Sequence, residues 1–345
     1  MKKLMRLCFS LCLICTGLFV FFNICLNHQN TPSQLSDSAG RFTFVCPKVN
    51  EGYWTSAAYG MKQQDEQQNT NTKFVGPTQY SAEEMRTAIL SAVSSDSDGI
   101  ITVGSRKDSE VIDALETADE AGIPVVLIDT DYDEINRICY IGTNNYEAGR
   151  LAGQDMTDSF SGSLHAAVIL VSKSSQNQTE RLRGFTDELA LHPDCHVETV
   201  LEANSNFLYL NEVLPQTLEE HPDINAIFCA EEYSSTIVGQ ILSSMGTKYD
   251  NIRVVAFDKM EETLNYVASG RYYSTIVQQS DRMGKLAVKL LCDYKKGILP
   301  EKDIIYTDSL SIRRENLHEL KKYESEGVVW HSYSGSLLSN PQQEN

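Results

Sequence analysis

The sequence predicts an α/β protein made of two similar lobes, each a doubly wound parallel sheet with helices on both faces. Three observations lead to this fold class. From residue 41 onward, short apolar runs alternate with amphipathic segments of helical spacing. The alternation begins again near residue 145. No Pro/Gly-rich stretch separates the two halves, so a flexible linker between independent domains is not expected.

In the first half, short apolar runs have the length of buried strands, and the segments between them have the spacing of amphipathic helices. Ser81 is followed three residues later by Glu84, a capping box that predicts the start of a helix. Gly122 predicts the end of the next helix. The expected strands are 42–47, 73–75, 99–103, 124–129 and 137–142, and the expected helices are 54–69, 81–94 and 108–121.

The second half repeats this alternation, which predicts a second sheet covered by its own helices. Beyond residue 314 the chain is charged, and then rich in Ser, Gln and Asn, so we expect a disordered tail over 331–345. The expected strands are 166–171, 197–203, 226–229, 253–257 and 275–277, and the expected helices are 145–159, 179–191, 208–221, 234–245, 260–269 and 281–296.

The amino terminus carries a membrane-directed segment. Lys2, Lys3 and Arg6 precede an almost uninterrupted apolar run over 7–26. About 20 residues at 1.5 Å each match a hydrocarbon core of roughly 30 Å. An uncleaved transmembrane anchor, a cleaved signal peptide and a lipidated anchor all remain open. In each case the positive residues stay inside, so the rest of the chain is expected outside the membrane, after a flexible stalk over 27–40.

The composition disfavours nucleic acid as a partner. The chain has 29 Lys and Arg against 47 Asp and Glu, a formal charge of −18. Binding to DNA or RNA depends on neutralising phosphates, which an acidic protein does poorly. Four of the nine cysteines lie in the first 25 residues. The other five stand singly, with no CxxC pair and an odd count, so their spacing predicts neither a disulfide framework nor a zinc site.

The sequence carries no enzyme signature and implies no cofactor. There is no glycine-rich nucleotide loop, no H-E-x-x-H zinc motif and no G-x-S-x-G nucleophile elbow. The histidines are expected in loops and on the surface, without a catalytic partner: His28, His165, His192, His196, His221, His318 and His331. We therefore expect a binding protein rather than an enzyme.

Eight short motifs, taken together, resemble a known family. In chain order they are VNEGYW at 49–54, DGII at 98–101, AGIPVVLID at 121–129, IGTNN at 141–145, ERLRGF at 180–185, HPDI at 221–224, VVAFD at 254–258 and TIVQ at 275–278. Their order and spacing resemble the type 1 periplasmic binding proteins of the ribose/galactose-binding kind. That family delivers sugars to ABC importers and shares its fold with the sensing domain of LacI-type repressors. The resemblance covers roughly 41–314.

The resemblance implies the periplasmic binding protein-like I fold, in which two lobes joined by a three-crossing hinge close on the ligand. The crossings are expected near 143–144, 278 and 307–310. Lobe one would then comprise 41–143 plus 279–306, and lobe two would comprise 144–278 plus 308–330.

The resemblance also implies a sugar site. Tyr53 and Trp54 match the stacking aromatic pair of the family, since aromatic rings cover the apolar faces of a sugar. The positions expected to bind the hydroxyl groups are Asn50, Asp129, Arg181, Asp258 and Gln278. From the residues alone, two alternatives stay open: Tyr53 and Trp54 as an ordinary helix start packed on the core, and Asp129 and Asp258 as helix N-caps. Arg181 is equally compatible with a pair to Asp187 or Glu188.

Two departures from the ribose-binding pattern make the expected site more acidic. Thr130 follows Asp129 where the family has an Arg, and Glu231-Glu232 stands where the family has Asn-Asp. We therefore include Glu231 among the ligand-binding residues. An acidic site repels anions, so we expect a neutral polyol or pyranose, or a ligand with an amine.

These features predict an extracytoplasmic sugar-binding protein tethered to the cell membrane, with an ABC permease as its partner. A membrane sensor kinase is the alternative partner, and a nucleoside or autoinducer is the alternative ligand. A LacI-type repressor is disfavoured, because a hydrophobic segment stands where a basic helix-turn-helix would be required.

Overall fold

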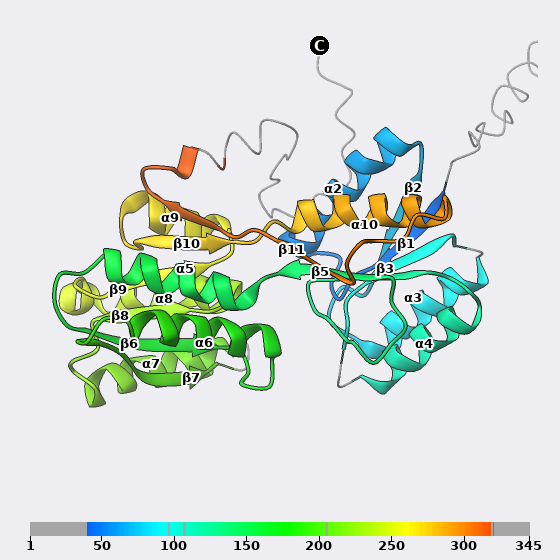
Figure 1. Ribbon diagram of the computed structural model, residues 1–345. Helices are drawn as coiled ribbons and strands as arrows, with labels where there is room; N and C mark the ends of the chain where they lie inside the picture. The colour runs from blue at the N-terminus through cyan, green and yellow to red at the C-terminus, as the bar shows by residue number, and fades with distance from the viewer. Residues whose placement is uncertain (1–39, 96, 106–107, 204–205, 319, 321–345) are drawn as a thin grey trace, which may run out of the picture. The chain divides into compact units, whose positions relative to one another are not determined.

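The computed structural model describes residues 40–95, 97–105, 108–203, 206–318 and 320, which belong to one compact unit beginning at Gly40 (Figure 1). Within it the chain forms two six-stranded sheets. We call each sheet with its helices a lobe. The predicted membrane segment at 7–26, the stalk up to residue 39 and the tail at 331–345 lie outside the described residues. None of the described helices is long and apolar enough to cross a bilayer.

The first sheet has the strand order β11-β5-β4-β3-β1-β2, and all its neighbouring strands are parallel. Helices α2 and α10 pack together against the sheet, and α3 packs with α4 (Figure 1). The strands are β1 (Arg41–Val45), β2 (Asn71–Val75), β3 (Gly99–Thr102), β4 (Val125–Ile128), β5 (Cys139–Thr143) and β11 (Ile304–Thr307). The helices are α2 (Gly52–Gln68), α3 (Ala82–Ser94), α4 (Ser109–Glu120) and α10 (Ser280–Lys295).

The second sheet repeats the arrangement with the order β12-β10-β9-β8-β6-β7, except that β12 runs antiparallel to β10. Its strands are β6 (Leu164–Leu170), β7 (Cys195–Glu202), β8 (Ala226–Cys229), β9 (Arg253–Phe257), β10 (Ser274–Val277) and β12 (Leu310–Arg313). Its helices are α5 (Asn145–Asp158), α6 (Gln176–Leu189), α7 (Phe207–Glu220), α8 (Glu232–Ser244), α9 (Glu261–Ser269) and the 3₁₀ turn η1 (Gly246–Tyr249).

The prediction of two α/β lobes with parallel sheets is confirmed, and two strands were missed. The sequence analysis did not foresee β11 and β12, the edge strands that complete the two sheets. Because β12 is antiparallel, the second sheet is mixed rather than wholly parallel. The predicted helix start at Ser81 is confirmed, since its hydroxyl accepts a hydrogen bond from the Glu84 amide as the N-cap of α3.

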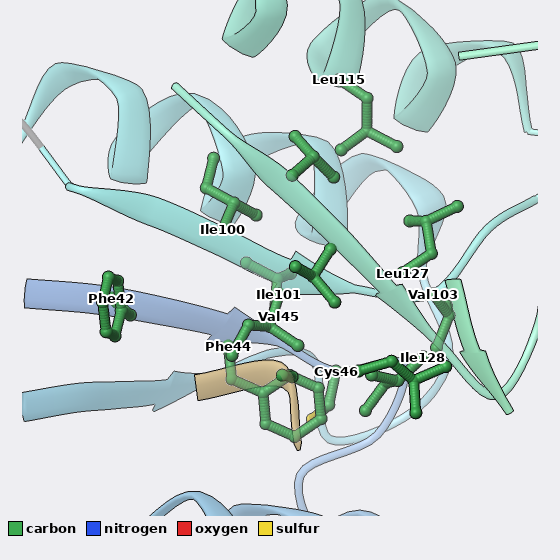
Figure 2. Close-up of a cluster of buried hydrophobic side chains, with 14 of the residues drawn as sticks. Phe42, Phe44, Val45, Cys46, Ile100, Ile101, Val103, Leu115, Leu127 and Ile128 are labelled. Atoms are coloured by element: carbon green, nitrogen blue, oxygen red, sulfur yellow. The ribbon is translucent and has the colours of Figure 1, made fainter. Parts of the chain in front are cut away.

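Apolar side chains fill both faces of the central strands. Figure 2 shows the core of the first lobe, where side chains of β1, β3 and β4 pack against one another. Every position of β3 and β4 is buried, which explains why their sequences are continuous apolar runs rather than alternating ones. In the second lobe, alternate residues of β6 enter separate cores on opposite faces of the sheet, with Ala167 and Ile169 in one and Ala166 and Val168 in the other.

The chain passes between the two sheets at three places. It leaves the first sheet after β5, returns after β10 when α10 packs on α2, and crosses again between β11 and β12. Gln278, between β10 and α10, lies at one of these crossings. Two of the crossings are in direct contact, because the Thr143 hydroxyl donates to Gln278 Oε1 at 2.8 Å.

Candidate ligand-binding site

The two sheets share one topology, which indicates where a ligand binds. In each lobe the first strand lies between the second and the third, as the orders β2-β1-β3-β4-β5 and β7-β6-β8-β9-β10 show. The chain therefore winds in opposite directions from the first strand. In open α/β sheets, ligands bind at the carboxyl ends of the strands beside such a switch point. Asp129 directly follows β4 and Asp258 directly follows β9, which places them at equivalent positions of the two lobes.

These two aspartates also have the same unusual backbone conformation. Asp129 has φ 66° and Asp258 has φ 63°, in the left-handed region that non-glycine residues rarely adopt. The neighbouring strand holds each in place. The Tyr140 hydroxyl donates to the Asp129 carbonyl at 2.7 Å, and the Thr275 hydroxyl donates to the Asp258 carbonyl at 2.5 Å. Backbone strain of this kind is concentrated at functional sites. Neither aspartate is a helix N-cap, the alternative that the sequence left open.

A buried guanidinium organises the site in the second lobe. Arg181, on α6, is only 3% exposed. Its Nε donates to Asn145 Oδ1 at 2.8 Å, its Nη1 to the Ala230 carbonyl at 2.8 Å and its Nη2 to Gln278 Oε1 at 3.0 Å. The guanidinium also lies over the Phe257 ring, 3.8 Å from its centroid. Asp187 and Glu188 instead bind Tyr146 and Arg150, so the alternative of a pair on its own helix is wrong.

Gln278 connects this guanidinium to the second strand-end carboxylate. Its Oε1 accepts hydrogen bonds from Arg181 and from Thr143, and its Nε2 donates to Asp258 Oδ1 at 3.0 Å. The amide therefore joins residues from both sheets through one buried side chain. Such a network fixes the orientation of the Asp258 carboxylate.

The first lobe contributes the aromatic pair. The Tyr53 hydroxyl, in the first turn of α2, donates to Asp129 Oδ1 at 2.7 Å, and Thr130 donates to Oδ2 at 2.8 Å. Tyr53 and Trp54 meet edge to face, with ring centroids 4.8 Å apart. Trp54 is 7% exposed and belongs to the hydrophobic core of the first lobe.

Two of the predicted site residues lie outside this network. Asn50 is exposed in the turn before α2. Glu231 is the N-cap of α8, where its carboxylate accepts the amides of Tyr233 and Ser234 at 2.7 and 2.6 Å. This capping role was not foreseen, because Glu is not among the residues that typically form N-caps, which are Ser, Thr, Asp, Asn and Gly.

The charges of the two lobes interact at the site. Burial raises the pKa of Asp258 from its ordinary 3.8 to about 6, although the Arg181 guanidinium favours the ionised form. The Asp129 carboxylate contributes to this rise, so the first lobe influences a group of the second. Burial lowers the pKa of Arg181, and the two aspartates oppose that change.

Three glutamates near these residues also have shifted pKa values. Burial raises the pKa of Glu51, which precedes α2, and of Glu231. It raises the pKa of Glu232 well above its ordinary value, and the charges of Asp258, Glu51 and Glu231 raise it further. The charges of Asp258, Asp129 and Glu231 act on the Arg181 guanidinium. Lys48 and Lys259 oppose the rise in pKa at Glu51 and Glu232, respectively.

Several residues that hold the site together were missed by the sequence analysis. Asn145, Tyr140, Thr275 and Phe257 all contact the predicted site residues. Asn145, Thr275 and Phe257 lie inside the short motifs described in the sequence analysis, and Tyr140 directly precedes one of them. Their residue types alone do not indicate a role in binding.

Comparison with known proteins identifies relatives along most of the chain. The pattern of the family described as "Periplasmic binding protein domain" matches residues 42–298. The ribose import binding protein RbsB of Bacillus subtilis (strain 168) is 23% identical over 206 residues, covering 59% of this chain and 65% of that protein. The D-apiose import binding protein of Actinobacillus succinogenes is 22% identical over 287 residues, covering 82% and 91%. The matches to the first ribose import proteins thus span a little under two thirds of their length.

Solved structures show the same fold. A glucose-galactose binding protein from Geobacillus stearothermophilus, GanP, superposes with a TM-score of 0.73 at 27% identity, covering 81% of this chain and 98% of that one. A chain in the XylFII–LytSN complex has a TM-score of 0.69 at 27% identity, covering 80% and 98%. With the family pattern spanning both lobes, the chain belongs to the periplasmic binding protein domain family.

Proposed function

We propose that this protein is an extracytoplasmic carbohydrate-binding protein that closes its lobes on a small sugar-like ligand and delivers it to an ABC importer. The observation that carries the proposal is the equivalent pair Asp129 and Asp258, presented at the carboxyl ends of matching strands and braced by Tyr53, Arg181 and Gln278. The names of the relatives support it, since they bind or import ribose, apiose and glucose or galactose.

The chemistry of the site favours a neutral ligand. Sugar hydroxyls donate to carboxylates and accept from guanidinium and amide groups, and charge-assisted bonds of this kind are the stronger ones. Three carboxylates, those of Asp129, Glu231 and Asp258, act on one buried guanidinium. This balance disfavours sugar phosphates and sugar acids, and it suits a neutral sugar or an amine. The proposed ligand-binding residues are Asn50, Tyr53, Trp54, Asp129, Arg181, Glu231, Asp258 and Gln278. This role requires no cofactor and no catalytic group.

The proposed mechanism is closure about the three crossings. Lobe one would comprise 41–143 plus 279–306, and lobe two 144–278 plus 308–330. A ligand that contacts both lobes is bound fully only in the closed state, so it shifts the population toward that state. The apolar segment 7–26 would direct the protein to the outer side of the membrane, and it would tether the protein there where it is retained or lipidated.

A membrane sensor is the second candidate partner. It is favoured by the similarity to XylFII, which is found in a complex with LytSN. Such a protein would use the same closure to report a ligand instead of delivering it. The genes beside this one discriminate the two: a permease and an ATPase support the importer, and a histidine kinase with its response regulator supports the sensor.

A thermal-shift screen tests the ligand class. The panel contains neutral sugars, amino sugars, polyols, nucleosides and anionic sugars. A ligand present at 100 times its dissociation constant adds about 2.7 kcal/mol to the free energy of unfolding. We expect a shift with a neutral or amino sugar that is lost in Asp258→Asn. A panel in which only anionic sugars or only nucleosides stabilise the protein would contradict the proposal.

A further inference from the structure

Three imidazoles and one carboxylate gather at the other end of the second sheet. His165 lies near the start of β6, His196 and Glu198 lie near the start of β7, and His221 directly follows α7. The candidate sugar site lies at the opposite, carboxyl end of these parallel strands. Since β6 has seven residues, the two places are separated by about 20 Å of strand.

The strand register brings these side chains to one place. His165 and His196 are directly opposite each other in the parallel pair, and their rings meet with centroids 4.4 Å apart. The register then shifts, so that Ala166 pairs with Val197 and Ala167 with Thr199. Glu198 is the extra residue of this bulge. Bulges redirect side chains, and this one leaves the Glu198 carboxylate beside the two imidazoles.

The donor atoms have the spacing that a metal ion requires. One atom each of His165, His196 and Glu198 lie within 4.8 Å of one another. His196 Nε2 is 3.0 Å and His165 Nδ1 is 3.7 Å from Glu198 Oε2. Metal–ligand bonds of 2.0–2.1 Å in a tetrahedral site separate the donor atoms by about 3.3 Å, close to both distances.

One of these atoms is buried without a hydrogen-bond partner. His165 Nδ1 is covered, yet no group among the described residues forms a hydrogen bond with it. Burying a polar atom without a partner costs folding free energy, unless a cation occupies its lone pair or a neighbour accepts its proton. Because it points at the same carboxylate oxygen as His196, a shared cation accounts for both imidazoles at once.

We propose that His165, His196 and Glu198 bind a divalent cation of the Zn²⁺ class. Two imidazole nitrogens and one carboxylate suit zinc, and three protein ligands leave a fourth position for water or a partner's side chain. His221 Nδ1 lies 3.3 Å from Glu198 Oε1, the oxygen that faces away from the other two imidazoles. It positions the carboxylate, as hydrogen-bonded outer residues do at metal sites. The inference is independent of the proposed sugar-binding function.

Calorimetric titration of the full chain with ZnCl₂ tests the site. The protein is purified in detergent without a histidine tag and stripped of metal. We expect one ion per chain, with a dissociation constant of about 1 µM or tighter. His196→Ala and Glu198→Gln should each weaken binding at least tenfold, and His221→Ala by about 10–100-fold. His192→Ala, which removes another exposed imidazole of the same lobe, is the matched control and should bind as the parent does.

The outcomes separate a built site from incidental binding. Titrations without saturation, or affinities unchanged by His196→Ala and Glu198→Gln, would overturn the proposal. Because the His196 side chain is 52% exposed, its alanine variant should unfold at the parent's temperature in EDTA, which shows that lost affinity is not lost folding. X-ray absorption of the zinc-loaded protein should show imidazole and carboxylate ligands. Sulfur ligands would place the ion on cysteines and refute the assignment.

Discussion

Among single residues, Arg181 makes the most consequential contacts of the candidate site. Its three donor groups form hydrogen bonds with Asn145, the Ala230 carbonyl and Gln278. Gln278 in turn donates a hydrogen bond to the Asp258 carboxylate. Removing one partner of a buried charged network leaves the others without compensation. Arg181 therefore has a structural role in addition to the ligand-binding role proposed for it.

Replacing Arg181 should destabilise the protein strongly. We expect Arg181→Ala to lower the free energy of unfolding by about 3–5 kcal/mol, because the Asp258 charge loses its counter-ion and buried acceptors lose their donor. Urea unfolding at pH 7 measures the change. The matched control is Arg183→Ala on the same helix, whose exposed pair with Glu180 is worth about 0–1 kcal/mol. Equal effects of the two substitutions would refute the network.

The raised pKa of Asp258 predicts a pH dependence of stability. The folded protein has an Asp258 pKa of about 6, against an ordinary value of 3.8. Between these values the unfolded chain is ionised while the folded one keeps its proton, so unfolding becomes easier as pH rises. The free energy of unfolding should therefore fall from about pH 4 to about pH 6 and then level off, as far as this group is concerned.

The test compares the parent with Asp258→Asn. The variant lacks the titrating group. As the pH rises through this window, the free energy of unfolding of the parent should therefore fall relative to that of the variant. Carboxylates that do not interact with Asp258 are the same in both proteins and cancel in the difference. Because the Asp258 charge raises the pKa of Glu232, the comparison is repeated in a Glu232→Gln background. A difference that is constant from pH 4 to pH 7 would show that Asp258 titrates normally.

At the scale of elements, the same close helix crossing occurs once in each lobe. In the first lobe, a Cβ at Gly60 of α2 would lie 1.9 Å from the Asp281 carbonyl of α10, and one at Gly284 would lie 2.1 Å from the Ala57 carbonyl. In the second lobe, Gly149 of α5 and Gly184 of α6 make the corresponding approaches, both at 2.0 Å. Each crossing thus depends on a pair of glycines.

Filling one of these crossings should separate the helices. Gly149→Ala would place a methyl group against the backbone of Arg181, so we expect a loss of about 1–3 kcal/mol in the free energy of unfolding. Because the displaced backbone carries the Arg181 side chain, ligand affinity should fall as well. Gly52→Ala, in the first turn of α2 with no atom within 4 Å of the added Cβ, is the control and should be nearly neutral. Matching losses in both variants would contradict this account.

The elements that the sequence analysis predicted are those with local signals. The strands 226–229 and 253–257 were predicted with their observed bounds, because continuous apolar runs of that length are typical of buried strands. Strands β11 and β12 were missed because each has four residues with polar or exposed members, and they become strands only by pairing with β5 and β10.

The candidate site was predictable only in part, for a similar reason. Asp129, Asp258 and Gln278 end apolar strands, a position that is visible in the sequence. The contacts of Arg181 with Asn145 and Ala230 join elements that are distant in the sequence. No local sequence pattern predicts such contacts. The histidine cluster is a sharper case, since His165, His196 and His221 are scattered in the sequence and meet only through strand register.

At the scale of the whole molecule, like charges from the two lobes should oppose the proposed closure. Glu51 and Asp129 belong to elements of the first lobe, and Glu231, Glu232 and Asp258 to elements of the second. The charge of Glu51 contributes to the raised pKa of Glu232, so the lobes repel each other when these groups are ionised. A ligand must overcome this repulsion in addition to the cost of ordering.

Removing one of these charges should therefore favour the closed state. We expect Glu232→Gln to lower the mean radius of gyration of the ligand-free protein at pH 8 and to tighten the binding of a neutral sugar, because both repulsion between the lobes and burial of a carboxylate are relieved. Small-angle X-ray scattering and calorimetry measure the two effects. Glu220→Gln, which removes an exposed charge on α7, changes the net charge equally and should leave both quantities unchanged. The effect should shrink as the pH falls, because burial and the neighbouring carboxylates raise the pKa of Glu232 and so favour its neutral form. A variant that is as open as the parent, yet binds the sugar more tightly, would place the effect of Glu232 on the ligand and not on closure.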